Sequence, residues 1–363
     1  MTAPLPPLST IGIIGGGQLG RMLAMAAARL SYRTVILEPQ AGCPAAQVAN
    51  HQIEAAYDDA AALGELARRA DVVTYEFENV PVAAAEKLAA STPVLPPPRA
   101  LEIAQDRLVE KRFLNEAGLP TAPFLRVDSD AELAAALADM GGNGVLKTRR
   151  LGYDGKGQKR FRDAGPGEAQ GSFAEMGGVP LILEGFVAFD REISIIAARA
   201  EDGGFAAYEP AENVHRDGIL HMSTVPAAIP PALAGLARDK AKALMEALDY
   251  VGVIGIEFFV VGNDLLANEF APRVHNSGHW TEAACAVSQF EQHIRAVAGL
   301  PLGATDRHAD CVMENLIGDD VDRLAELAAE AGAVVHLYGK AEARPGRKMG
   351  HVTRLVPAAI TGR

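Results

Sequence analysis

The sequence predicts an α/β protein with more than one domain, in which a parallel sheet covered by helices comes first and strand-rich segments follow. Residues 9–100 alternate between short apolar strands and amphipathic helices, and a different, strand-rich pattern begins after them. The chain has 363 residues, which is more than one compact core usually holds. Hydrophobic residues make up 49% of it, a composition typical of globular proteins.

The N-terminal segment predicts a Rossmann-like domain over residues 1–100. Its expected strands are 9–14, 34–37 and 71–75, and its expected helices are 18–30 and 54–70. Strands that alternate with helices pair in parallel, because each helix returns the chain to the same edge of the sheet. The run Pro93-Val94-Leu95-Pro96-Pro97-Pro98 breaks any helix and therefore marks a boundary.

The rest of the chain predicts a larger second domain over residues 101–300 and a small β-rich domain over residues 301–363. Helices are expected at 99–117 and 230–248. Apolar runs and turn residues predict strands at 144–148, 181–187, 193–199, 251–261, 265–270, 312–316 and 333–337.

Composition excludes several classes of protein. The net charge of −12 argues against nucleic acid as a partner. Three widely spaced cysteines provide neither a disulfide framework nor a paired metal motif, which fits a reducing compartment. No apolar run is long enough to span a membrane, and the N-terminus lacks the pattern of a secretory signal. We therefore expect a cytoplasmic protein with no membrane partner.

A glycine-rich turn follows the first strand. Gly15-Gly16-Gly17-Gln18-Leu19-Gly20 fits the dinucleotide-binding pattern, and Glu38 ends the second strand where such proteins bind a ribose. An NAD-dependent dehydrogenase is therefore one hypothesis. Amides at a helix N-terminus attract any phosphate, however, so a phosphorylated sugar would fit equally well.

A second glycine-rich loop, Gly152-Tyr153-Asp154-Gly155-Lys156-Gly157-Gln158, follows the strand that carries Lys147. Flexible backbone of this kind can close over phosphates and present its amides to them, although the loop does not match a P-loop. Lys147 could meet nucleotide phosphates as a point charge. The strand end at Glu184-Gly185-Phe186-Val187 could bind an adenine edge, and Glu192 could accept ribose hydroxyls.

A hairpin is predicted around Asn263, and it carries two glutamates. Glu257 and Glu269 both lie six positions from this turn, so we expect them to face each other across the hairpin. Opposed like charges among apolar neighbours need neutralisation. Mg²⁺ prefers carboxylate, water and phosphate oxygens, so we predict a magnesium site here.

Taken together, these motifs resemble the ATP-grasp superfamily, and longer stretches narrow the resemblance to the 5-(carboxyamino)imidazole ribonucleotide synthases over residues 9–356. The stretches are Gly15 to Gly20 with Arg21-Met22, Thr74-Tyr75-Glu76-Phe77-Glu78, Asn268-Glu269-Phe270-Ala271-Pro272-Arg273-Val274-His275-Asn276-Ser277-Gly278-His279-Trp280-Thr281 and Arg344-Pro345-Gly346-Arg347-Lys348-Met349-Gly350-His351. The resemblance implies an ATP-grasp fold with a mobile lid over about residues 120–187, and usually a homodimer.

The resemblance also implies a reaction of purine biosynthesis: ATP, bicarbonate and 5-aminoimidazole ribonucleotide give ADP, phosphate and the N-carboxylated ribonucleotide. Glu257 and Glu269 would hold the Mg²⁺ ions, expected to number two. The residues expected to bind ATP are Arg107, Lys147, Gly152, Tyr153, Asp154, Gly155, Lys156, Gly157, Gln158, Glu184, Gly185, Phe186, Val187, Glu192, His215, Asn268 and Glu269.

Roles in the chemistry can be assigned as hypotheses. Lys147 and Arg273 would neutralise charge during phosphoryl transfer, and Asp154 or its rival His275 would carry a proton. The ribonucleotide is expected to contact Gly17, Gln18, Leu19, Glu76, Tyr153, Asn276, Ser277, Lys340, Arg347 and Lys348. A formate-using ligase and a biotin carboxylase would share the nucleotide site, and the dehydrogenase remains the hypothesis from another class.

Overall fold

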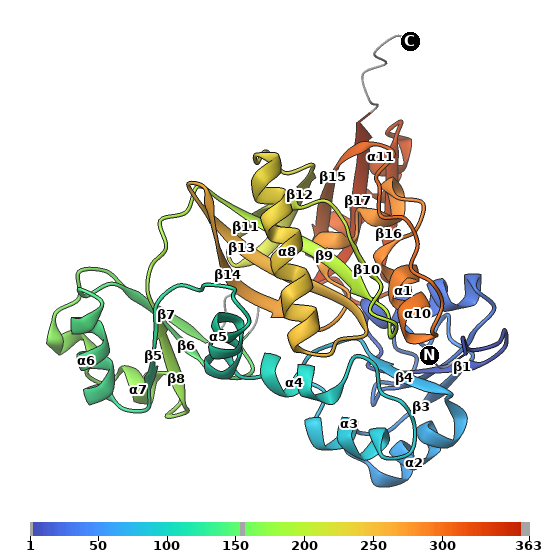
Figure 1. Ribbon diagram of the computed structural model, residues 1–363, viewed down its shortest axis with the longest axis horizontal. Helices are drawn as coiled ribbons and strands as arrows, with labels where there is room; N and C mark the ends of the chain where they lie inside the picture. Colours follow the sequence, from blue (N-terminus) through green and yellow to red (C-terminus); the bar gives the residue numbers. More distant parts are fainter. Residues whose placement is uncertain (1–2, 153–156, 357–363) are drawn as a thin grey trace.

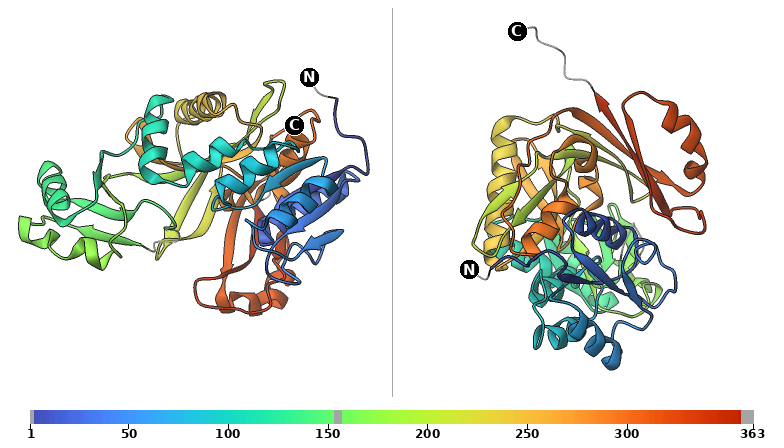
Figure 2. Two further views of the ribbon diagram at one scale, coloured as in Figure 1. Left: turned by 90° about the horizontal axis from the view of Figure 1, so that it is seen from below. Right: turned by 90° about the vertical axis from the view of Figure 1, so that its right-hand side faces the viewer.

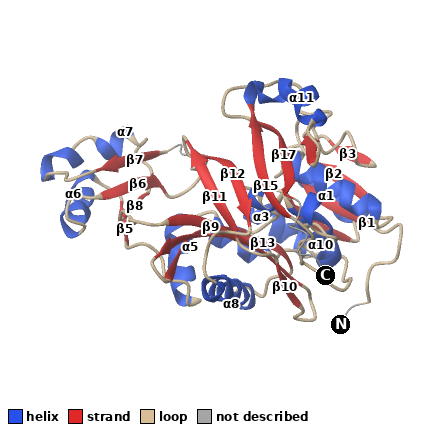
Figure 3. Cartoon of the chain, turned by 90° about the horizontal axis from the view of Figure 1, so that it is seen from above, coloured by secondary structure: helices blue, strands red, loops and turns tan. Residues whose placement is uncertain are grey.

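Three β-sheets organise the chain in the computed structural model, which describes residues 3–152 and 157–356. The N-terminal sheet and the lid sheet lie at opposite ends of a large central sheet (Figure 1). Seen from above, the lid projects away from the rest of the molecule (Figure 3). Among the described helices, none is both long and apolar enough to cross a membrane.

The N-terminal sheet is parallel throughout, in the order β3-β2-β1-β4. Helix α1 packs on one face, and α2 and α3 pack on the other, so both faces of β1 are buried. This burial explains why β1 is a continuous apolar run without alternation. The elements are β1 Thr10–Ile14, α1 Gln18–Arg29, β2 Arg33–Leu37, β3 His51–Ile53, α2 Ala60–Arg69, β4 Val72–Tyr75 and α3 Val82–Ala89.

The lid is built on an antiparallel sheet in the order β5-β8-β6-β7. Helix α6 and the short helix α7 cover one face of it, and Leu133, Leu137, Leu146, Phe161 and Leu183 share their core. The elements are β5 Phe124–Val127, α6 Asp130–Asp139, β6 Gly144–Thr148, β7 Gln158–Phe161, the 3₁₀ helix η1 Pro166–Ala169, α7 Ser172–Glu175 and β8 Leu181–Glu184.

The central sheet runs in the order β14-β13-β9-β11-β12-β15-β17-β16, with β10 paired to β9. Alternate residues of β9 face α8 on one side and α10 on the other, and α10 also packs against α1 of the N-terminal region. The strands are β9 Arg191–Arg199, β10 Phe205–Ala207, β11 Ala211–Arg216, β12 Ile219–Val225, β13 Gly252–Val261, β14 Asp264–Ala271, β15 Asp310–Ile317, β16 Ala333–Leu337 and β17 Lys348–Val356.

The helices of this part are α8 Pro231–Ala247, α9 Thr281–Ala284, α10 Gln289–Val297 and α11 Leu324–Ala329, with 3₁₀ helices η2 Asn276–Gly278 and η3 Gly318–Arg323. The C-terminal strands β15, β17 and β16 do not form a sheet of their own, because β15 pairs with β12 and extends the central sheet. Figure 2 shows these C-terminal strands extending beyond the body of the molecule.

The helix expected at 99–117 is two helices, α4 Pro98–Ala104 and α5 Arg107–Glu116. The first ends at Ala104, and Asp106 caps the second: its carboxylate accepts hydrogen bonds from the backbone amides of Leu108 and Val109. The helix expected from residue 54 likewise begins only after the cap Asp59. Both boundaries were wrong because the capping aspartates were read as helix interior.

Candidate active site

A cavity of about 1320 Å³ lies where the N-terminal sheet, the lid, the central hairpin and the C-terminal strands meet. Sequence-predicted residues from all four parts line it: Gln18, Leu19, Glu76, Arg107, Lys147, Gly152, Gly157, Gln158, Glu192, His215, Glu257, Asn268, Glu269, Arg273, His275, Asn276, Lys340, Arg347 and Lys348. These residues are far apart in the sequence, so the fold brings most of the predicted site together.

Some predicted residues lie elsewhere. Tyr153, Asp154, Gly155 and Lys156 are outside the described residues. Six other predicted residues are not among the described residues that line the cavity: Gly17, Ser277, Glu184, Gly185, Phe186 and Val187. Ser277 is fully buried behind His275 and its hydroxyl lies 2.8 Å from Nδ1 of that ring, so it orients the imidazole.

The hairpin of β13 and β14 places Glu257 opposite Glu269, as the sequence predicted. The strand register that produces this pairing differs from the one that the sequence predicted. Val261 pairs with Asp264, so the turn consists of Gly262 and Asn263 only, and a bulge beside Glu257 restores the expected pairing. Asn268 is the extra residue on β14, and it lines the same cavity as the two glutamates.

The two glutamates have opposite electrostatic environments. Burial alone would raise the pKa of Glu269, but the Arg107 guanidinium, 2.8 Å from its Oε2, lowers it to about 2. Burial, and then the charge of Glu269, raise the pKa of Glu257 to about 7. The pair therefore carries less than two negative charges at neutral pH, because the charges of His215 and Lys348 only partly offset the effects that raise the pKa of Glu257.

His275 lies beside this pair, with its Nε2 3.7 Å from Oε1 of Glu257. Burial, and then the charges of Arg273 and Lys348, lower the pKa of His275 to about 3. The imidazole is therefore neutral at physiological pH. Arg273 itself is held by Glu78, whose Oε2 is 2.5 Å from its Nε.

Lys147 is paired with Glu184, 3.0 Å away, and Glu184 is also 3.2 Å from Nζ of Lys111. Lys111 is 2% exposed and donates to the carbonyl of Asn268, so it connects the lid to the bulge. The sequence analysis missed Lys111. The available signal was a lysine on the apolar stripe of α5, three residues after Leu108 and three before Leu114.

Glu110 is a second residue that the sequence analysis missed. It is buried and accepts a hydrogen bond of 2.8 Å from the amide of Phe270 in β14. Burial, and then the charge of Glu269, raise its pKa to about 8. Glu110 therefore stays largely protonated at neutral pH and adds little negative charge beside the predicted metal ligands.

Glu192 and His215 form an ion pair of 2.6 Å on the cavity wall. They reach each other because β9 pairs with β11, and β11 carries a bulge at His215. Burial opposes the charged form of His215, but the hydrogen bond to Glu192 raises its pKa overall.

The glycine-rich turn after β1 is occupied by the protein's own carboxylates. Glu76 accepts hydrogen bonds from the amides of Gly17 and Gly20, the latter at 2.7 Å, and Glu38 accepts one of 2.9 Å from Gly16. The Tyr57 hydroxyl also donates to Glu38 at 2.5 Å. Glu38 is thus engaged in holding the turn, which removes the main argument for a nicotinamide ribose there.

Lysine and arginine side chains form the cavity wall next to this turn. Lys340, Arg347 and Lys348 come from the segment between β16 and β17 and from the start of β17. Nζ of Lys340 donates to the carbonyl of Lys348 at 2.7 Å, and Arg347 donates to the carbonyl of Glu342 at 3.0 Å. These contacts hold the segment as one unit beside Gln18 and Leu19.

A lid over a cleft, a lysine on a lid strand and acidic residues on an antiparallel hairpin define an ATP-grasp protein. Family models match the chain in three consecutive stretches: the ribonucleotide synthetase preATP-grasp domain over residues 8–105, the ATP-grasp domain over residues 112–290 and the phosphoribosylaminoimidazole carboxylase C-terminal domain over residues 311–359. The expected ATP-grasp fold is confirmed, and the dehydrogenase hypothesis is wrong.

Individual relatives give the family. The N5-carboxyaminoimidazole ribonucleotide synthase of Brucella melitensis is 67% identical over 357 residues, covering 98% of this chain and 99% of that protein. The Pseudomonas aeruginosa protein of the same name is 49% identical, covering 94% and 93%. The chain belongs to the N5-carboxyaminoimidazole ribonucleotide synthase family.

Solved structures agree with this placement. The ADP complex of an N5-carboxyaminoimidazole ribonucleotide synthetase has a TM-score of 0.94 at 41% identity, covering 99% of this chain and 95% of that one. An Aspergillus clavatus synthase in complex with ADP and 5-aminoimidazole ribonucleotide has a TM-score of 0.90 at 31% identity, covering 97% and 94%.

Proposed function

We propose that the chain carboxylates 5-aminoimidazole ribonucleotide on its exocyclic amine, using ATP and bicarbonate, and gives the N5-carboxylated ribonucleotide of purine biosynthesis. The observation that carries this proposal is that two groups of residues line the same cavity. Arg107, Lys147 and the opposed glutamates are suited to a nucleotide and its metal, and a cationic wall lies beside the N-terminal turn. Membership in the synthase family supports the same reaction.

In the first chemical step, an oxygen of bicarbonate attacks the γ-phosphorus of ATP. The new O–P bond forms while the bond to the ADP oxygen breaks, which yields carboxyphosphate and ADP. The protein's task is to position both anions and to neutralise charge. Lys147 and Arg107 face the cavity and are suited to the phosphates, provided that they leave their present partners Glu184 and Glu269.

The donor set of the hairpin fits Mg²⁺. Glu257 and Glu269 present carboxylate oxygens from opposed positions at the cavity wall, and the raised pKa of Glu257 supports a cation there, because a positive charge beside it would favour the ionised carboxylate. We propose that these two residues hold two Mg²⁺ ions, which when bound supply positive charge to the phosphate oxygens. Asn268, the bulged residue between the strands, adds an amide at the same place.

In the second step, carboxyphosphate releases CO₂ and phosphate, and the amine of the ribonucleotide forms a bond to the CO₂ carbon as it loses a proton. Water must be excluded here, because it would consume the intermediate. Closure of the loop at 152–158, of which residues 153–156 lie outside the described residues, would exclude it.

Asp154 and His275 were both candidates for the proton carrier. The pKa of His275 is about 3, so this imidazole is a poor proton acceptor at neutral pH. We therefore assign the proton to Asp154. Glu257 lies 3.7 Å from His275, and its carboxylate would be a second candidate for the proton carrier if it bound no metal ion.

The phosphate of the ribonucleotide is assigned to Lys340, Arg347 and Lys348, with Gln18 and Leu19 beside them. The amides of Gly17 and Gly20 are held by Glu76, so they become available only if that carboxylate turns away. Glu76 would then be released toward the substrate amine, its predicted partner. Asn276 completes the wall between the two halves of the cavity.

The rest of the nucleotide is assigned to the remaining predicted contacts. Glu192, paired with His215, would accept ribose hydroxyls, and the backbone of residues 184–187 would bind the adenine edge as the lid closes.

We also propose a homodimer in the cytoplasm; the three cysteines are free and buried, as expected in a reducing compartment. Light scattering on the purified chain tests the dimer.

Phosphate release from ATP tests the reaction directly. We expect slow release with bicarbonate alone and strong stimulation when 5-aminoimidazole ribonucleotide is added, with the N-carboxylated product detected by labelled bicarbonate. Stimulation by the ribonucleotide with formate in place of bicarbonate would overturn the assignment, and so would the absence of any stimulation.

A further inference from the structure

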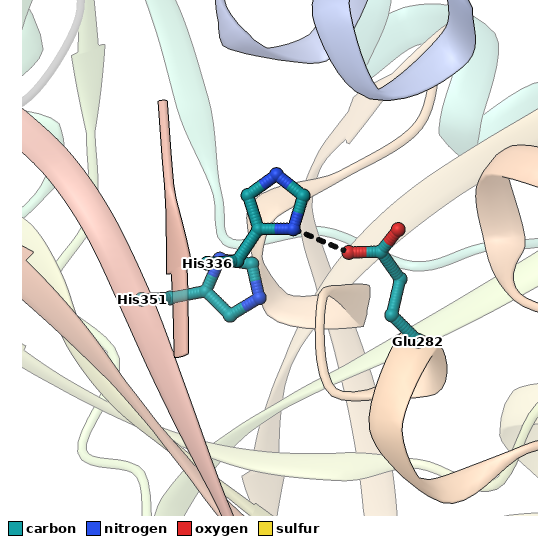
Figure 4. Close-up of side chains that lie close together, drawn as sticks. All are labelled: Glu282, His336 and His351. Atoms are coloured by element: carbon teal, nitrogen blue, oxygen red, sulfur yellow. Dashed lines mark ion pairs between the residues drawn. The ribbon is translucent and has the colours of Figure 1, made fainter. Parts of the chain in front are cut away.

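Three side chains with metal-binding groups converge beside the C-terminal strands, outside the active-site cavity (Figure 4). His336 of β16 and His351 of β17 lie directly opposite each other in the antiparallel pair. Glu282 of α9 faces them, with its Oε2 3.2 Å from Nδ1 of His336. One ligand atom from each residue lies within 4.8 Å of the other two. None of the three is among the described residues that line the active-site cavity.

The buried ring of this cluster, that of His351, is oriented by a contact with a tyrosine hydroxyl. The Tyr338 hydroxyl, which is fully buried, lies 2.9 Å from Nδ1 of His351. This contact leaves Nε2 as the free edge of the ring, and Figure 4 shows that edge turned to the side where Glu282 lies. Histidines that bind metals commonly use their second nitrogen in this way, because the outer partner fixes the tautomer and the ring.

The spacing suits a small transition-metal ion. Bonds of about 2.0–2.1 Å in a tetrahedral site place neighbouring ligand atoms about 3.3–3.5 Å apart. The contact between Glu282 and His336, at 3.2 Å, is close to this length. The two rings are stacked at 9° with centroids 5.3 Å apart, so one must rotate about its second side-chain torsion, which is soft in histidine.

Access from solvent also fits. Glu282 is exposed and the side chain of His336 is 17% exposed, so an ion can enter from solvent, whereas His351 is buried.

We propose that Glu282, His336 and His351 bind one Zn²⁺ ion, with water as the fourth ligand. Two imidazoles and one carboxylate favour zinc over magnesium, which prefers oxygen ligands alone. The ion would tie α9 to the hairpin of β16 and β17. The site is separate from the magnesium site at Glu257 and Glu269, and the proposal does not depend on the proposed function.

Metal titration of the purified full-length chain tests the site. Mg²⁺ and ADP are present at saturation so that the active site is filled. We expect one equivalent of Zn²⁺ by calorimetry, a Co²⁺ visible spectrum of tetrahedral intensity and a Zn²⁺-dependent rise in the unfolding temperature. Glu282→Gln and His336→Gln should each weaken binding by at least about tenfold and remove the Co²⁺ spectrum.

His51→Gln is the matched control. His51 and Glu65 form an exposed histidine–glutamate pair 3.8 Å apart in the N-terminal region, and no second imidazole is described beside them. This variant should bind zinc as the wild type does. The proposal is overturned if the wild type shows no saturable binding, if both cluster variants bind normally, or if the control loses binding equally. Because Glu282 is exposed, its variant should fold even if His336→Gln does not.

Discussion

Replacing Glu257 by Gln should make the unliganded protein more stable at alkaline pH while abolishing its activity. Glu257 is half-buried opposite Glu269, and the charges of His215 and Lys348 only partly offset the burial and the charge of Glu269 that raise its pKa. Arg107 pairs with the opposite glutamate, Glu269, at 2.8 Å. Gln has nearly the same volume and no charge, so the substitution removes repulsion without creating a cavity. It also removes one of the two proposed metal ligands.

The sign and size follow from proton binding. The pKa of Glu257 rises from 4.5 to about 7 on folding. Between these values the folded chain keeps a proton that the unfolded chain has released, so stability falls as pH rises through this window. Each pKa unit corresponds to about 1.4 kcal/mol, which sets an upper limit of about 3 kcal/mol at pH 8. Since Glu269 and His215 titrate with it, we expect a gain of about 1–3 kcal/mol from Glu257→Gln.

Urea unfolding in EDTA without nucleotide measures this gain, at about pH 8 and about pH 5. The gain should be largest at the higher pH and mostly lost at the lower one. Glu314→Gln is the control of opposite sign, because Arg354 and Arg323 hold the pKa of Glu314 below its ordinary value. That variant should be destabilised at the higher pH. A Glu257→Gln variant that is destabilised, or that gains equally at both pH values, would refute the reasoning.

Three further substitutions test the site. Asp154→Asn should lower kcat for carboxylation by about 10²–10⁴ while the KM for ATP changes little; unchanged turnover would exclude Asp154 as proton carrier. Arg347→Ala should raise the KM for the ribonucleotide by about tenfold, and an unchanged KM would remove Arg347 from the phosphate site. Lys111→Met should destabilise the chain by about 2–3 kcal/mol in urea unfolding, since buried Glu184 would lose its ion pair with Lys111 and keep the one with Lys147; a neutral effect would contradict the buried network.

Local patterns in the sequence predicted the parts of the fold that depend on neighbours in the chain. The strands β1, β2 and β4 are continuous apolar runs between helices, and they form the expected parallel sheet. The facing of Glu257 and Glu269 was predicted from distance to the turn alone. The prediction succeeded although the turn is centred half a residue earlier, because the bulge at Asn268 compensates. Nothing in a one-dimensional pattern shows such a bulge.

Contacts between distant segments could not be predicted in this way. Strand β7, Gln158–Phe161, is polar at three of its four positions and has no apolar alternation, so it was missed. The C-terminal strands were expected as a small β-rich domain, and the pairing of β15 with β12, which joins them to the central sheet, is not visible in the sequence pattern. Lys111 and Glu110 act through partners more than 70 residues away, Glu184 and Phe270.

Carboxylates of the protein pair with the cations of the site, and this arrangement bears on how ATP binds. Arg107 is held by Glu269, Lys147 by Glu184 and Arg273 by Glu78. Phosphates alone would have to compete with these carboxylates for the same cations. If Mg²⁺ arrives with the nucleotide, Glu269 gains a positive partner as Arg107 turns to the phosphates, and Glu257 gains a further positive charge beside its carboxylate. We infer that nucleotide and metal bind as a unit. The phosphates draw Arg107 away from Glu269, and the metal replaces the positive charge that Glu269 then loses.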